Sequence, residues 1–171
     1  MFRNSPRFLT AFSLAFLLLV TACSPAKTDS TWEQFQTESP AAVVDGSAAK
    51  VLSGGQFNQF FPPDGDGYAR VYTQEKEGFA EAKLKQNGEE LAMLSVSDTA
   101  ANPAAAEKYR RGSMTIAGFP AAEIGSTATG VLVGDRIQVK VLSRSDGFTA
   151  EDRQTWLQKF DLMGLESLAT Q

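Results

Sequence analysis

The sequence predicts an α+β domain, in which an antiparallel sheet of about five to seven strands carries helices packed on one face. Two stretches are predicted to form β-hairpins, because alternating apolar and polar residues flank the turn dipeptides Asn87-Gly88 and Gly134-Asp135. The third observation is a helical pattern at residues 150–160, where apolar residues recur on one side. Strands followed by a C-terminal helix are typical of the α+β class.

The first hairpin is expected over residues 79–96, with a further strand before it at residues 68–75. Asn87-Gly88 favours a type I′ turn, in which both central residues take positive φ. Small and aliphatic residues alternate with charged ones, so one face is predicted to be buried and the other to face water. The residues assigned to the buried face are Ala80, Ala82, Leu84, Ala92, Leu94 and Val96.

The second hairpin is expected over residues 130–142, with its turn at Gly134-Asp135. Two weaker strands, at residues 114–116 and 121–124, are expected on either side of a Gly-Phe-Pro bend. The alternation along the return strand of the hairpin again predicts one buried face. Its inward-facing residues are Ile137, Val139 and Val141.

Helical segments complete the predicted domain. Residues 103–111 are expected to form a short helix with Pro103 in its first turn. Thr149 is expected to cap the C-terminal helix, with Asp152 three positions later in a near-capping box. A short element with helical spacing also precedes the prolines at 62–63. The apolar residues assigned to these elements are Phe57, Phe60, Phe61, Trp156, Leu157, Phe160, Leu162, Leu165 and Leu168.

The N-terminal segment predicts an export signal. Arg3 and Arg7 are its only charged residues, and an uncharged apolar stretch follows from Phe8 to Val20. As a helix this stretch would span roughly 20 Å, whereas a transmembrane helix must cross a hydrocarbon core of roughly 30 Å. We therefore expect a cleaved signal peptide at residues 1–22 rather than a permanent membrane span.

The segment Val20-Thr21-Ala22-Cys23 resembles the lipobox of bacterial lipoproteins, in which an aliphatic residue, a small residue and Gly or Ala precede a cysteine. The resemblance implies that the Cys23 thiol receives a diacylglyceryl group, that signal peptidase II cuts before Cys23, and that the new amine is acylated. Each buried methylene of an acyl chain such as palmitate contributes about 0.8 kcal/mol to membrane binding. Ser24 lacks the aspartate that retains lipoproteins in the inner membrane, which favours a periplasm-facing outer-membrane location in a host with two membranes.

Three parts are predicted along the chain: the signal peptide at 1–22, a lipidated cysteine and flexible tether at 23–56, and an α+β domain at 57–171. The tether is rich in Ser, Ala, Thr, Gly and Pro, which is typical of a flexible linker. A capping-box pattern at residues 30–33 predicts one short helix within it. This helix would carry two aromatic residues, Trp32 and Phe35. They would either dock on the domain or on a partner, or stay exposed in a disordered tether.

Composition excludes several kinds of chemistry. The 171 residues include no histidine and one cysteine, which excludes histidine-based triads, Cys–His pairs, zinc held by these residues and an internal disulfide. Loss of Arg3 and Arg7 with the signal leaves 14 scattered basic residues against 20 acidic ones, a net charge of −6, so no nucleic-acid partner is expected. The Asp64-Gly-Asp66 pattern departs from a calcium loop at Tyr68, and neither a metal nor a cofactor is expected.

A longer resemblance covers residues 57–165. This stretch, which includes FNQFFP, YTQEKEGFAEAKL, IAGFPA and VLVGDRIQVKV, resembles uncharacterised cyanobacterial lipoproteins. No activity or binding residue follows from that resemblance. The order of strands and helices is also similar to the PsbP-like α+β fold, although a fold alone does not determine a function.

The sequence therefore predicts a lipid-anchored envelope domain that is not an enzyme and that binds or scaffolds another envelope component. Its expected partners are the membrane, through the acyl chains on Cys23, and an envelope protein. The alternative is a small-ligand binder with a pocket between sheet and helix, lined by Phe57, Phe60 and Trp156. A third hypothesis is a hydrolase that uses paired carboxylates, but neighbouring acids such as those at 89–90 do not converge on a strand.

Overall fold

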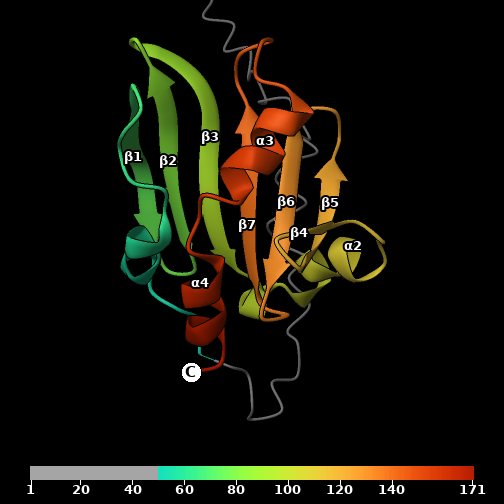
Figure 1. The fold of residues 1–171 in the computed structure, drawn as a ribbon. Helices are drawn as coiled ribbons and strands as arrows, with labels where there is room; N and C mark the ends of the chain where they lie inside the picture. Colours follow the sequence, from blue (N-terminus) through green and yellow to red (C-terminus); the bar gives the residue numbers. More distant parts are fainter. Residues whose placement is uncertain (1–49) are drawn as a thin grey trace, which may run out of the picture. The chain divides into compact units, whose positions relative to one another are not determined.

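The computed structural model describes residues 50–171, which form a seven-stranded antiparallel sheet with helices packed against it (Figure 1). The predicted α+β class and antiparallel sheet are confirmed. The predictions on the signal peptide, on Cys23 and Ser24, and on Trp32 and Phe35 in the tether lie outside the described residues. In the described part of the chain, no helix combines the length and apolar character needed to cross a membrane.

The strands lie in the order β1-β2-β3-β7-β6-β5-β4, and every neighbouring pair is antiparallel. The two predicted hairpins are β2–β3 and β6–β7, and they join at the middle of the sheet through β3 and β7. Figure 1 shows β1 at one edge and β5 towards the other. The bounds are β1 Tyr68–Lys76, β2 Phe79–Gln86, β3 Glu89–Asp98, β4 Thr115–Ile116, β5 Phe119–Ile124, β6 Ala128–Val133 and β7 Ile137–Ser143.

Both hairpin turns have the backbone conformation that their dipeptides predict. Asn87 and Gly88 take φ values of 51° and 86°, and Gly134 and Asp135 take 56° and 58°. Two consecutive positive φ values are the requirement of a type I′ turn, which Asn, Asp and Gly tolerate best. The Asn87-Gly88 turn brings β2 and β3 into the register that places their small and aliphatic inner residues on one face.

Helices α3 (Ala150–Leu157) and α4 (Leu162–Ala169) and the 3₁₀ helix η1 (Gly54–Phe60) cover one face of the sheet. In Figure 1, α3 and α4 lie in front of the central strands, where α3 contacts β6 and β7. All residues that the alternation assigned to the inner face are buried in this core, which confirms that assignment. They are Ala80, Ala82, Leu84, Ala92, Leu94, Val96, Ile137, Val139 and Val141.

The expectation that the helices all pack on one face is wrong for the segment that follows β3. Helices η3 (Pro103–Ala106) and α2 (Glu107–Arg110) place Tyr109 in a second, smaller cluster with Leu132. Leu132 belongs to β6 and alternates with Val131, which faces the main core, so this cluster lies on the opposite face. The apolar residues of β6 are therefore buried on both faces of the sheet. A continuous apolar run of this kind shows no two-residue alternation, so the sequence pattern alone does not distinguish a fully buried strand from a helix or a half-buried strand.

The last residues of the predicted tether contact the sheet. Helix η1 starts at Gly54, which is buried because the carbonyl oxygens of Lys76 and Phe79 occupy the space that a Cβ would need. The N–H of Gly78 also donates to the carbonyl of Leu52 at 2.7 Å. Leu52 and Gly54 are thus held against the sheet, and Gly54 permits this close approach of backbone to backbone.

Candidate functional site

A buried ion pair lies at the end of the sheet where the described chain begins. Asp98 is the last residue of β3, and Arg136 stands immediately before β7. Arg136 Nε donates to Asp98 Oδ1 at 2.9 Å and Nη2 donates to Oδ2 at 2.8 Å. The Asp98 side chain has no exposed surface and the Arg136 side chain is 15% exposed. Because the two bonds are parallel, the pair fixes the orientation of both groups.

Two backbone donors add to the charge stabilisation of Asp98. Leu52 N–H donates to Oδ2 and Ala100 N–H donates to Oδ1, each at 2.9 Å. Burial by itself would raise the pKa of the Asp98 carboxyl, but the hydrogen bonds from Arg136 and from these backbone groups outweigh burial, so the pKa lies below its ordinary value of 3.8. The hydrogen bonds to Asp98 in turn raise the pKa of Arg136. Both groups are therefore charged at neutral pH.

Arg136 also binds the two ends of the described chain. Its Nη2 donates to the carbonyl of Lys50 at 2.6 Å, and its Nη1 donates to the carbonyl of Ala169 at 3.4 Å. A guanidinium has five N–H groups, and these bonds together with those to Asp98 use four of them. Arg136 therefore positions chain segments rather than offering itself to a ligand. We call the pair and its bonds to residues 50–52 and Ala169 the Asp98–Arg136 clamp.

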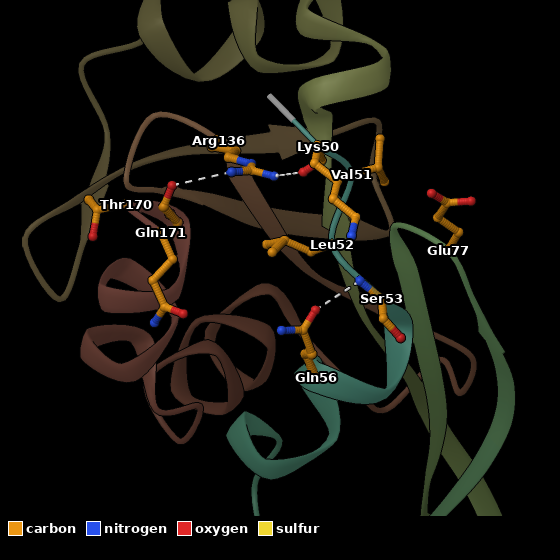
Figure 2. A pocket seen from close by; sticks show the side chains of 10 residues that line it. Lys50, Val51, Leu52, Ser53, Gln56, Glu77, Arg136, Thr170 and Gln171 are labelled. Atoms are coloured by element: carbon orange, nitrogen blue, oxygen red, sulfur yellow. Dashed lines mark hydrogen bonds between the residues drawn. The ribbon is translucent and has the colours of Figure 1, made fainter. Parts of the chain in front are cut away.

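A pocket of about 740 Å³ lies beside the clamp, between the segment at residues 50–56 and the end of α4 (Figure 2). Gln56 is held on its wall, because Ser53 N–H donates to Gln56 Oε1 at 3.0 Å. The pocket combines aliphatic and charged side chains. The aliphatic ones are Val51, Leu52 and Ala169, and the charged ones are Lys50, Glu77 and Arg136.

The three residues that the sequence nominated as a pocket lining gather in the main core rather than around one pocket. Phe57 is fully buried in the core, and Phe60 packs partly buried against that core. Trp156 lines a second pocket of about 480 Å³, together with Pro62 and Lys159 among others. The Nζ of Lys159 lies 4.3 Å from the centre of the Trp156 ring, so a cation already covers that aromatic face.

Sequence reasoning also missed a buried arginine on α3. Arg153 is 4% exposed and faces the sheet. Its Nε donates to Thr129 Oγ1 at 2.8 Å, its Nη1 to Ser143 Oγ at 3.0 Å and its Nη2 to Glu123 Oε2 at 2.9 Å. The available signal was its spacing three residues before Trp156, on the same side of the helix. These bonds lock α3 onto β5, β6 and β7.

In the acidic turn after η1, Asp64 stabilises the start of β1. Asp64 Oδ1 accepts a hydrogen bond from Arg70 N–H at 2.7 Å, at the start of β1. Across residues 50–171, no three or more acidic or cysteine side chains gather as metal ligands would.

Comparisons with protein-family models, with curated proteins and with solved structures find no match to this chain.

Proposed function

We propose that this chain is a lipid-anchored lipoprotein of the cell envelope, whose folded domain binds or scaffolds another envelope component and catalyses no reaction. The observation that carries the proposal is the lipobox, because the one cysteine of the chain stands where that chemistry requires it, after a basic start and an apolar stretch. Two long acyl chains on Cys23 would keep the protein on a bilayer without any residue of the domain entering the membrane.

The clamp supports this proposal because it gives the anchor a firm attachment point on the domain. Lys50 and Leu52 are bonded to Arg136 and Asp98, which adjoin the central strands β7 and β3. A mechanical force applied through the predicted tether would therefore be transmitted to the central strands of the sheet. If residues 24–49 behave as a flexible coil, their root-mean-square span is roughly 30 Å. Mild repulsion between anionic lipid and a processed chain of net charge −6 favours a domain that stands off the surface.

The anchor is tested by labelling cells with a radioactive or clickable palmitate analogue. We expect the natural chain to carry the label and to lose it in Cys23→Ala, which should accumulate as uncut precursor. Ser24→Ala is the matched control and should keep both label and processing. Ser24→Asp should move the protein to the inner membrane on a density gradient. Label that persists in Cys23→Ala would refute the anchor.

The binding role is tested by photo-crosslinking in the native envelope. Val71 and Met163 are exposed apolar side chains, 46% and 65% accessible, and a photoreactive residue at either position samples a different part of the surface. We expect one discrete adduct from at least one position, identified by mass spectrometry, and none from a photoreactive residue at Lys85. Equal, diffuse labelling from all three positions would argue against a specific protein partner.

The pocket in Figure 2 favours a second candidate function, the binding of a small molecule. Lys50 and Glu77 place one charge of each sign on its lining, which suits a ligand that carries both charges. Native mass spectrometry of the protein extracted from membranes would detect such a ligand. Thr170→Trp, just after α4, should fill the pocket from an exposed position and remove the ligand, whereas Ser167→Trp within α4 should retain it.

The likeness to the PsbP-like fold and to cyanobacterial lipoproteins remains part of this proposal. The antiparallel sheet with helices against it is compatible with that fold, and the strand order gives a specific pattern to compare. The likeness to this fold does not indicate a particular ligand, because one fold serves many functions.

A further inference from the structure

The sheet has an outer face, opposite the helices α3 and α4 that lie in front of it in Figure 1. Of the described helices, η3 and α2 pack on this outer face, where their cluster lies over β5 and β6. The helices of the main core lie on the other side of the sheet. The described helices therefore leave the outer face of the central strands β2, β3 and β7 without a covering layer.

One row of side chains across these three strands carries opposite charges on either side of a serine. Glu81 of β2 pairs with Ser95 of β3, and Ser95 pairs with Lys140 of β7. The residues next to each of them along the strands are buried in the main core, so alternation places all three side chains on the outer face. Neighbouring strands lie about 4.8 Å apart, so the two charged residues flank the serine at equal backbone distances.

The two charged groups of this row have no counter-charge among residues 50–171. Neither Glu81 nor Lys140 takes part in an ion pair there. Glu81 accepts a hydrogen bond from the hydroxyl of Thr73 at 3.0 Å, which leaves its charge uncompensated. Ser95 is 2% exposed, because its short side chain lies between two long ones. The row therefore offers one negative and one positive group, separated by a small side chain.

We propose that two copies of this chain associate through their outer faces, with a two-fold axis that lies in the interface and runs along β3. A half-turn about this axis exchanges the β2 side of the row with the β7 side. Glu81 of one copy then faces Lys140 of the second copy, and the same contact is repeated by symmetry, so all four charges are paired. An in-plane axis across the strands would instead place like charges opposite each other, which is unfavourable.

The rows on either side of Ser95 are compatible with the same axis. Met93 and Ser97 stand two residues before and after Ser95 on β3, so they would meet their own copies at the axis. Met93 pairs with Lys83 of β2 and with Leu142 of β7, so Leu142 of one copy would face the aliphatic stem of Lys83 in the second copy. Small and apolar side chains therefore lie at the axis, and the opposite charges lie beside it.

The expected interface is small, which favours association on a membrane. Three strands are about 14 Å wide and three rows of side chains about 20 Å long, so the contact falls below the roughly 800 Å² per partner of a standard interface. A weak dimer of this kind gains from the high effective concentration of chains held on one bilayer. The axis along β3 also keeps both clamp ends, where Arg136 holds Lys50, at the same end of the dimer. Both tethers would then lead to one membrane, and this point rests on the proposed lipid anchor.

Crosslinking of the processed, lipidated chain in phosphatidylcholine vesicles tests the geometry. Ser97→Cys places a free thiol at the axis, since the Cys23 sulfur carries lipid in the proposed anchor. A short bis-maleimide should join two such copies into a covalent dimer. Ser167→Cys is the matched control, because it is exposed on α4 on the opposite side of the sheet, and it should give at least fivefold less dimer. Equal yields from the two positions would overturn the proposal.

Charge reversal separates specific pairing from proximity on the vesicle. In the Ser97→Cys chain, Glu81→Lys and Lys140→Glu should each lower the dimer yield at least fivefold, because like charges then face each other. The double variant should restore the yield, and so should a mixture of the two single variants in the same vesicles. Arg111→Glu, at a side chain that is 79% exposed, changes the charge equally outside the row and should leave the yield unchanged. A misfolded chain would not regain dimer formation, so a double variant as weak as the single ones would overturn the proposal.

Palmitate labelling of the same samples separates this proposal from the lipid anchor. Recovery of the dimer by charge exchange in a chain without label would refute the anchor and support the interface. A labelled chain whose dimer yield does not respond to charge exchange would refute the interface and support the anchor.

Discussion

Asp98→Ala is the substitution that tests the clamp most directly. The Asp98 carboxylate accepts two hydrogen bonds from Arg136 and one each from the backbone N–H groups of Leu52 and Ala100. Alanine removes all four bonds and leaves the guanidinium of Arg136 without its counter-charge. The loss therefore affects both the buried charge and the attachment of the first residues of the domain.

The expected cost follows from burial. Removal of one partner from a buried ion pair typically costs about 3–5 kcal/mol. Because 15% of the Arg136 side chain is exposed, water reaches part of the uncompensated charge, and we take the lower end, about 3 kcal/mol. In a domain of roughly 120 residues, 1 kcal/mol shifts the thermal midpoint by about 3–5 °C, so the midpoint should fall by about 10 °C.

Thermal unfolding followed by circular dichroism measures this change, with Glu107→Ala as the control. Glu107 pairs with Arg110 at 3.0 Å, but it is 45% exposed, and exposed pairs contribute little to stability. Hydrogen exchange should also speed up at the N–H of Leu52, which donates to Asp98. A midpoint that falls no further in Asp98→Ala than in Glu107→Ala, with exchange at Leu52 unchanged, would refute the clamp.

Three further outcomes follow from the structure. Trp156→Ala should lower the free energy of unfolding in urea by about 3–5 kcal/mol, because its ring packs in the core; a near-zero change would mean that α3 docks elsewhere. Gly130→Ala should cost about 1–3 kcal/mol, because its Cβ would meet the Tyr109 hydroxyl, and adding Tyr109→Phe should recover part of that loss. The free energy of unfolding, measured against pH, should decline in acid. The pKa of Asp98 is lower in the folded state, so the stability that this carboxylate contributes is present above its unfolded pKa near 3.8 and is lost as the pH falls through its folded pKa. Asp98→Ala should flatten this part of the curve.

The strands and turns could be predicted because their determinants are local. Asn87-Gly88 favours positive φ by its own stereochemistry, and the alternation along β2 and β7 follows from the two-residue repeat of an extended chain. The Thr149 cap was predicted in the same way, since Thr149 and Asp152 are three residues apart and bond to each other's backbone.

The candidate site could not be predicted from such patterns. Neither Asp98 nor Arg136 stands out, because a charged residue at a strand end is ordinarily solvated. Residues 50–56 have the composition of a linker, and it is the approach of Gly54 to the strand backbone and the hydrogen bonds of Lys50 and Leu52 that attach them to the domain. The burial of Arg153 likewise depends on its hydrogen bonds to Thr129 and Glu123, which lie on strands distant in the sequence, because a buried charge without partners is unfavourable.

Local patterns in the chain were enough to specify the two hairpins, the inner faces of β2, β3 and β7 and the capped C-terminal helix, since each depends on residues within a few positions of one another. The pairing of β3 with β7, the cover of the second face by α2 and the contact of Asp98 with Arg136 across 38 positions became visible in the folded domain. They leave no trace in local patterns because a hydrogen bond between distant residues produces no periodicity in either segment. It forms only after the intervening strands have folded and brought its donor and acceptor together.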